Sequence, residues 1–505
     1  MFHKVNFALN FHLLFALLIV APFLYFFLQN VTMIEFIGIE FLWIFLAYTS
    51  LFFIVFIICT YFFPKRSRQL LLSISVFSFL QFYFLDFRAS LGLIGFVHSA
   101  IIALGLIGVL SLFIGYLLRW GMARNFLLIF LSLNVLSDLP NLLFVPQSQD
   151  VKAESSSNLN VPPGNLSSSL LNRRENIYYI IPDGMASPKT MQSYFRLDIN
   201  KHIDNLKTKG FSVATHNYSA YNITHLTLAS LFNMDYMATD ITEPYQDRTP
   251  FYPNLLSKQT NLVDYLKSNG YGTILVPPSW GGCPNSIDIE CLRPRNATIF
   301  DSYSADTFLK GSFIDRLQQR LWQSVDMDDS IPTAVEYMRT MPNIWSKGGV
   351  FTIVHTLIPH APYRDENCSI ITFDENISFK QKYSSSVLCV LKRIEEITDF
   401  IIDNDPDAVV IVQSDHGVTI PSLVVEAQEP FDNLPQEYID ARLGNFNAVY
   451  GCGAHSAAQH NQVNIVRFVV ECLNGRTIEN NLDNLSYYGF YESHSLFGKV
   501  FEVKK

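Results

Sequence analysis

Three apolar segments of the sequence are each followed directly by acidic or imidazole side chains. The segments and the side chains at their ends are 177–181 with Asp183, 350–354 with His355 and His360, and 408–412 with Asp415 and His416. Carboxylate oxygens and imidazole nitrogens are ligands that bind divalent metal ions in proteins. Each residue alone also has an ordinary interpretation, as a turn former or a structural hydrogen-bonding group. Their recurrence at equivalent positions predicts that they share one metal site.

A threonine at the expected start of a helix is a candidate nucleophile. The apolar spacing after Thr224 predicts a helix that begins there, and a helix N-terminus favours bound anions. A hydroxyl beside a divalent metal has a lowered pKa and can attack phosphorus near neutral pH. Thr224 or Asn222 could instead simply cap the helix. The metal ligands expected nearby favour the nucleophile.

The elements that must position these residues follow from the pattern after residue 176. Short β-branched runs alternate with helical stretches such as 261–268 and 387–402. Continuous apolar strands that alternate with helices predict an α/β domain whose mainly parallel sheet is flanked by helices. Ligands bind such sheets outside the carboxyl ends of the strands, where the candidate residues fall. We expect this catalytic domain to span residues 177–505.

The first 145 residues have a different composition. They hold 7 basic and 4 acidic side chains, whereas residues 146–505 hold 29 and 41. They contain apolar runs at about 5–28, 41–63, 70–87, 95–118 and 126–145. Since a spanning helix needs roughly 20 apolar residues, we predict a multi-pass membrane domain with five transmembrane helices in residues 1–145. Residues 146–176 are rich in Ser, Pro and Gly and are predicted to form a flexible linker.

Basic residues orient these spans. With five spans, six basic residues lie on the same side of the membrane: Lys4, Lys65, Arg66, Arg68, Arg119 and Arg124. That side is expected to be cytoplasmic, which puts the catalytic domain outside the cytoplasm. The net charge of −12 on residues 146–505 argues against nucleic-acid binding, which needs a basic face.

Cysteine usage agrees with an exported domain. Cys59 lies within the second apolar run and is expected to pack as a small apolar residue. The other six cysteines follow residue 280, and an even number in an exported domain suggests disulfides. Pairing between nearest neighbours would form three bridges, but other pairings and free thiols stay open.

The order of these motifs resembles the alkaline phosphatase and sulfatase superfamily. More narrowly, it is similar to the membrane-anchored branch of lipoteichoic acid synthases and lipid A phosphoethanolamine transferases. The specific motifs are Ser414-Asp415-His416-Gly417 and the His-x4-Pro-His-x-Pro-Tyr element that ends at Tyr363. Residues 463–468 also resemble a segment of these domains, although the residues themselves suggest no role for it.

The resemblance implies a role for each candidate residue. Asp183, Thr224, Asp415 and His416 would hold one divalent metal ion, zinc or manganese, and Thr224 would be the nucleophile. His360 would contact the transferred phosphate or the leaving group. His355 would be a second contact with the substrate.

The implied reaction is the transfer of a phospholipid head group, phosphoethanolamine or phosphoglycerol, through a phospho-threonine intermediate. The donor would be a membrane phospholipid and the acceptor an envelope glycolipid or glycan. The protein would then be integral to a bacterial-type inner (plasma) membrane, with its catalytic domain on the periplasmic or extracellular side.

The same sequence features also bear on three other functions: a sulfatase, a hydrolase and a non-catalytic protein. A sulfatase that converts Cys or Ser to formylglycine is disfavoured, because the nearest match to Cys/Ser-x-Pro-x-Arg, residues 291–295, has its Pro one place too late. A phosphodiesterase or other hydrolase, with water as the acceptor, would use the same residues. A non-catalytic membrane interaction protein with a degenerate sulfatase fold would have lost a ligand, and none is missing.

Overall fold

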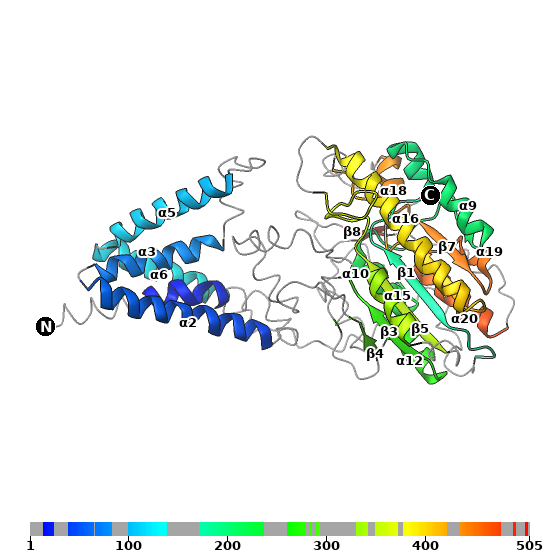
Figure 1. Cartoon of the computed structure of the whole chain (residues 1–505), viewed down its shortest axis with the longest axis horizontal. Helices are drawn as coiled ribbons and strands as arrows, with labels where there is room; N and C mark the ends of the chain where they lie inside the picture. The colour runs from blue at the N-terminus through cyan, green and yellow to red at the C-terminus, as the bar shows by residue number, and fades with distance from the viewer. Residues whose placement is uncertain are drawn as a thin grey trace. The chain divides into compact units, whose positions relative to one another are not determined.

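In a computed structural model, the chain divides into two compact units, one built on the N-terminal helices and one on an α/β sheet (Figure 1). The structure describes residues 14–24, 39–64, 66–82, 99–118, 120–138, 171–236, 260–278, 283, 289–292, 330–341, 349–371, 377–421, 435–475, 488–490 and 500–502.

The first unit contains a helix in each of the five apolar runs. The helices are Leu14–Leu24, α2 (Ile39–Phe62), α3 (Ser67–Gln81), α5 (Ser99–Leu117) and α6 (Gly121–Asp138). Helix α3 packs against both α2 and α5. Cys59 is a free, buried cysteine in the apolar cluster of these helices, which confirms its predicted packing role.

Fewer membrane spans are supported by length and composition than the sequence predicts. Among the described helices, α2 is long and apolar enough to cross a membrane over Phe45–Phe62. Helices α5 and α6 pass the same test only as a pair, bent by 115°. Leu14–Leu24 and Ser67–Leu80 are shorter apolar helices. Length and composition therefore support α2 as one membrane span, and α5 with α6 as a second if the bent pair forms a single span. The five-span arrangement stays a prediction.

The second unit is built on a seven-stranded sheet. In spatial order its strands are β2 (Ser212–Val213), β7 (Asn447–Tyr450), β6 (Val409–Gln413), β1 (Ile177–Pro182), β5 (Val350–Thr356), β3 (Gly272–Val276) and β4 (Ile289–Cys291). The pairs from β6 to β4 are parallel, whereas β7 is antiparallel to both β6 and β2. The mainly parallel sheet is confirmed, and β7 makes it a mixed one.

Side chains of β1 alternate between two apolar cores, as the period of a strand requires. Tyr178 and Ile180 belong to the core that includes α9 (Asn200–Thr208), α15 (Ser330–Thr340) and α16 (Phe379–Asn404). Tyr179 and Ile181 belong to the core that includes α10 (Thr224–Asn233), α12 (Asn261–Ser268) and α20 (Gln462–Leu473). The predicted helices therefore cover both faces of the sheet, and α15 and α16 are seen crossing it in Figure 1.

Shorter elements complete the described part of this unit. They are α8 (Pro188–Thr190), a π-helix (Met191–Phe195), α18 (Gln436–Arg442), α19 (Ala454–Ala457) and an antiparallel pair of strands, β8 (Tyr488–Phe490) and β9 (Val500–Glu502). Helix α18 ends beside the loop that follows β6, because the amide of Gly417 donates a hydrogen bond to the carbonyl of Arg442.

Three disulfides join nearest neighbours in the sequence, as one of the open pairings suggested. They are Cys283–Cys291, Cys368–Cys389 and Cys452–Cys472. The second ties the loop after β5 to α16, and the third ties the segment after β7 to α20. Cys291 is therefore part of a disulfide, in agreement with its rejection as a source of formylglycine.

Gly417 provides a test of the packing behind the β6 loop. A Cβ atom at this position would lie 2.0 Å from the carbonyl oxygen of Ala441 and 2.6 Å from that of Gly444. Since backbone atoms cannot rotate away, we expect Gly417→Ala to lower the stability by about 1–3 kcal/mol or more. The measurement is the thermal unfolding midpoint of the purified full-length protein.

Gly272→Ala is the matched control, because nothing lies within 4 Å of a Cβ atom there. Its midpoint is expected to change little. An unchanged midpoint for Gly417→Ala would contradict the packing described for this loop.

Candidate active site and metal centre

Three neighbouring strands bring the candidate residues to one edge of the sheet. Strand β1 lies between β5 and β6 and is parallel to both. Asp183 directly follows β1 and donates its backbone amide to the carbonyl of Thr356, at the end of β5. His355 is the penultimate residue of β5 and lies opposite Ile181, and Asp415 lies two residues after the end of β6. The predicted convergence at the carboxyl ends is confirmed.

Asp183, His355 and Asp415 form a buried group that could hold a metal ion. One ligand atom from each lies within 4.8 Å of the others. Asp183 Oδ1 and Asp415 Oδ2 are buried and accept no hydrogen bond from the described residues. Two buried carboxylate oxygens without donors are unfavourable unless a cation offsets them. The donor set of carboxylates and imidazole suits zinc or manganese, so these residues fit a divalent ion.

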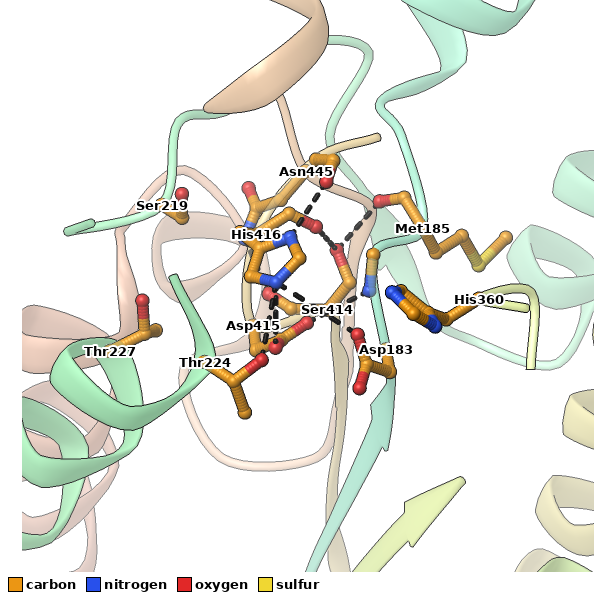
Figure 2. A network of polar contacts seen from close by, with 12 residues as sticks. Asp183, Met185, Ser219, Thr224, Thr227, His360, Ser414, Asp415, His416 and Asn445 are labelled. Atoms are coloured by element: carbon orange, nitrogen blue, oxygen red, sulfur yellow. Dashed lines mark hydrogen bonds and ion pairs between the residues drawn. The ribbon is translucent and has the colours of Figure 1, made fainter. Parts of the chain in front are cut away.

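His416 and Thr224 lie against this group (Figure 2). His416 Nε2 is 3.3 Å from Asp415 Oδ2 and 3.9 Å from Asp183 Oδ1. Its Nδ1 is 2.7 Å from the carbonyl oxygen of Gly417, which orients the other nitrogen toward the carboxylates. Thr224 Oγ1 is 3.2 Å from the same Nε2. The Thr224 hydroxyl therefore lies next to atoms that could bind the metal.

Helix α10 begins at Thr224, as the apolar spacing predicts. Ile223 occupies the N-cap position, and its side chain makes no capping hydrogen bond. Thr224 is therefore the first residue of the helix and does not occupy the N-cap position. Its hydroxyl faces His416 while its backbone belongs to the first turn of the helix, where amides favour an anion.

His360 approaches the group from another direction. It is exposed, in the loop after β5, and the peptide bonds before Pro359 and Pro362 are both cis. In Figure 2 its imidazole lies on the opposite side of Asp183 from Thr224. An exposed imidazole here can reach a bound substrate, whereas His355 is fully buried.

The electrostatics favour an ionised carboxylate at Asp183. Burial by itself would raise the pKa of this carboxyl group. The imidazole of His355, whose Nε2 lies 3.6 Å from Asp183 Oδ2, together with those of His360 and His416, outweighs burial and lowers the pKa to about 2. Asp183 therefore offers a full negative charge to a cation at neutral pH.

Several supporting residues were missed by sequence reasoning. The amide of Gly184 donates to Asp415 Oδ1 at 2.9 Å, so only the other carboxylate oxygen faces the group. The hydroxyl of Tyr383, on α16, donates to the carbonyl of Gly184 and accepts from the amide of Ala186, both at 2.9 Å. Arg442 Nη1 lies 3.1 Å from His416 Nδ1. Tyr383 lies within a helix and Arg442 at the end of one, and neither position has a sequence pattern that would indicate these contacts.

All six candidate residues lie in the described part of the chain, and five of them come together around the buried group. These are Asp183, Thr224, His355, Asp415 and His416. The individual roles stay predictions. His355, predicted as a substrate contact, lies among the atoms that could share an ion.

A family model described as Sulfatase matches residues 175–466, more than half of the 505 residues. The chain belongs to the sulfatase family. It thus joins a superfamily of metal-dependent enzymes of sulfuryl and phosphoryl transfer. No curated protein matches the sequence. The matched residues contain the whole buried group and also Thr224, whose hydroxyl lies 3.2 Å from His416 Nε2.

Solved structures of low identity also match. The C-terminal periplasmic domain of EptC from Escherichia coli is 10% identical, with 66% of this chain and 96% of that chain covered and a TM-score of 0.41. The lipooligosaccharide phosphoethanolamine transferase EptA from Neisseria meningitidis is 14% identical, with 92% and 95% covered and a TM-score of 0.38. A protein of the alkaline phosphatase superfamily from Vibrio parahaemolyticus is 12% identical, with 64% and 74% covered and a TM-score of 0.39. At these identities and TM-scores, the matches do not indicate which reaction this protein catalyses.

The fit of the buried group to a metal is testable with Asp415→Asn. This change keeps the shape of the side chain but removes the charge of a buried oxygen that lacks a donor. Because a metal site needs deprotonated ligands, we expect the wild-type protein to retain zinc or manganese after dialysis and the variant to lose it. Elemental analysis of the purified full-length proteins measures this.

Asp405→Asn is the matched control. Asp405 accepts hydrogen bonds from Asn176 at 2.7 Å and Tyr178 at 3.2 Å, before β6 rather than after it. This variant should keep its metal. Equal metal contents in Asp415→Asn and wild type would show that the buried group is not the metal site.

Proposed function

We propose that this sulfatase-family protein transfers a phospholipid head group, phosphoethanolamine or phosphoglycerol, to an envelope glycolipid or glycan through a phospho-threonine intermediate. One observation carries the proposal. The hydroxyl of Thr224 lies 3.2 Å from His416 Nε2, beside carboxylate oxygens that lack hydrogen-bond donors. A hydroxyl held against such a group is a nucleophile for phosphorus.

Asp183, Thr224, Asp415 and His416 would hold the divalent ion, and His355 lies close enough to contribute. When bound, the ion would lower the pKa of the Thr224 hydroxyl and offset the negative charge of the phosphate. The protein's own groups prepare the same site. The carbonyl of Gly417 holds the ring of His416, and the amide of Gly184 turns the carboxylate of Asp415.

The reaction would proceed in two displacements. In the first, Thr224 Oγ1, whose proton has passed to solvent, forms a bond to phosphorus while the bond from phosphorus to the diacylglycerol oxygen breaks. His360 gives a proton to that leaving oxygen, which is the role its exposed position beside Asp183 allows. In the second, the acceptor hydroxyl loses its proton to His360 and attacks the phosphorus of phospho-threonine, which frees Thr224.

The cellular arrangement follows from the chemistry of the cysteines and the apolar helices. Disulfides persist in oxidising compartments, and the catalytic unit contains three. We therefore assign the catalytic domain to the periplasmic or extracellular side of a bacterial-type inner membrane. A phospholipid donor and an envelope acceptor are both present at that surface, and the linker predicted at residues 146–176 would tether the enzyme to them. Its residues 146–170 lie outside the described part of the chain, whereas Leu171, Asn172 and Asn176 make hydrogen bonds with the catalytic unit.

Removing the nucleophile tests the proposal directly. Thr224→Val keeps the shape of the side chain but lacks the hydroxyl, so we expect head-group transfer to fall at least about a thousandfold. Mass spectrometry of membrane lipids and envelope glycolipids from cells that express each variant measures the donor consumed and the acceptor that gains mass.

Thr398→Val is the control, because the Thr398 hydroxyl is buried and donates within α16, to the carbonyls of Ile394 at 2.7 Å and Glu395 at 3.1 Å. It should transfer at the wild-type rate. Transfer by Thr224→Val would refute the phospho-threonine route. Release of a free phosphorylated head group by wild type, with no acceptor gaining mass, would identify a hydrolase instead.

The proton transfer assigned to His360 makes a separate prediction. His360→Asn should lower the rate with a phospholipid donor by about 10²–10⁴. The loss should be much smaller with a p-nitrophenyl phosphodiester, since that leaving group needs no proton. Release of the leaving group from each donor in the first turnover measures the difference, because the second displacement uses His360 whichever donor is present.

The control is His202→Asn, which alters a histidine paired with Glu395 at 2.9 Å, away from the buried group. Both donors should react with it at wild-type rates. An equal loss with both donors in His360→Asn would mean that His360 binds the substrate and transfers no proton.

A further inference from the structure

The start of α20 contains a buried glutamine that no step above uses. Gln462 is the first residue of this helix and directly precedes the segment 463–468, which resembles the family but had no assigned role. Its side chain is 1% exposed. The helix is capped by Asn461, whose side chain accepts from the amide of Asn464, so capping does not require Gln462.

The amide group of Gln462 joins two loops that are distant in the sequence. Its Nε2 donates to the carbonyl of Ser414 at 2.7 Å and to the carbonyl of Asp415 at 3.0 Å. Its Oε1 accepts from the amide of Ala220 at 3.0 Å. One side of the glutamine therefore holds the turn that carries Asp415 and His416, and the other side holds the loop that enters α10.

Packing reinforces this bridge. Val463, the next residue of α20, lies in one buried apolar cluster with Ala220, Tyr221 and Leu226. These residues precede and follow Thr224, so the first turn of α20 contacts the helix start on both sides of the candidate nucleophile. Helices α10 and α20 also pack against each other.

We infer that Gln462 is a positioning residue that sets the separation between the Thr224 hydroxyl and the Asp415–His416 turn. These two groups belong to different loops, and Gln462 hydrogen-bonds to the backbone of both. A small change in such a separation has a large effect, since displacing a reacting group by about 1 Å can lower a rate about a hundredfold. The inference rests on the proposed function for the roles of Thr224 and Asp415.

The test compares Gln462→Met with Asn176→Leu, two changes that replace a buried amide by an apolar side chain of similar shape. Asn176 also joins separate segments, because its side chain donates to Asp405 at 2.7 Å and accepts from the amide of Val350 at 3.0 Å. It does so at the opposite ends of the strands, before β1 and β6 and at the first residue of β5. Both variants lose buried hydrogen bonds, but only one of them touches the loops of the site.

Three quantities are measured on the full-length protein in detergent. They are the thermal unfolding midpoint, the affinity for Zn²⁺ by calorimetry after removal of metal with a chelator, and kcat and KM for transfer. We expect both variants to lower the midpoint. Gln462→Met alone should weaken Zn²⁺ binding or lower kcat by about 10–100-fold, as changes behind metal ligands do, with KM little altered.

A second variant covers the case in which Gln462→Met does not fold. Gln462→Asn keeps the polar amide but is one methylene too short to reach both loops. It should lower Zn²⁺ affinity or kcat in the same direction, with a smaller fall in the unfolding midpoint than Gln462→Met, because its amide keeps part of the hydrogen bonding. Wild-type affinity and kcat in this variant, or an equal loss in Asn176→Leu, would overturn the inference.

The two proposals fail in different ways. If wild type binds Zn²⁺, Gln462→Asn weakens that binding and no head group is transferred, the positioning role stands and the proposed function fails. If wild type transfers the head group, Thr224→Val does not, and both Gln462 variants match wild type in affinity and kcat, the positioning role fails alone.

Discussion

The burial of two carboxylates against each other is the constraint on which the catalytic unit depends. Asp183 and Asp415 lie in one group, each with an oxygen that accepts no hydrogen bond from the described residues. Like charges in a buried place repel each other, so folding them together is unfavourable until a cation is bound between them. The imidazoles of His355 and His416 lower this cost only in part, since they lie 3.3 to 3.9 Å from the carboxylate oxygens.

The surrounding structure holds the carboxylates in spite of this repulsion. Strand β1 pairs with β6 on one side and β5 on the other, so the turns that carry the acids cannot move apart without breaking the ladder. Behind the first turn, the hydroxyl of Tyr383 holds the carbonyl of Gly184 and the amide of Ala186. Burial keeps this hydroxyl protonated, because it raises the pKa of Tyr383 far above that of a free tyrosine. Behind the second turn, Gln462 and the end of α18 hold the backbone of residues 414–417.

This arrangement separates the rigid and the accessible parts of the site. Asp183, His355 and Asp415 are buried and belong to the centre of the sheet, whereas Thr224 is half-buried and His360 is exposed. The residues that could hold a metal in the buried group are thus fixed at the ends of the central strands, whereas Thr224 and His360 lie on a helix start and a loop. Sulfatase-family membership is consistent with this division, because the same strand ends fall within the matched residues.

Much of the site was predictable because its signals are local. A short apolar strand followed by Asp, Asp-His or paired His is visible within ten residues, and the parallel order of β6, β1 and β5 makes these ends meet. The start of α10 at Thr224 followed from apolar spacing alone. The supporting residues were not predictable, since a tyrosine in an amphipathic helix or a glutamine at a helix start has no distinctive local pattern.

The sequence by itself determined the α/β architecture, the strand-end chemistry and the apolar character of the first 145 residues, all of which depend on composition and short-range periodicity. Only the tertiary structure decided which of the possible disulfides form, that β7 runs antiparallel, that His355 joins the carboxylates, and that Gln462 and Tyr383 support the two turns. The last contacts join residues about 200 or more positions apart, such as Gln462 with Ala220. Their partners are set by which strands and helices become neighbours when the whole domain packs, and no local pattern encodes that choice.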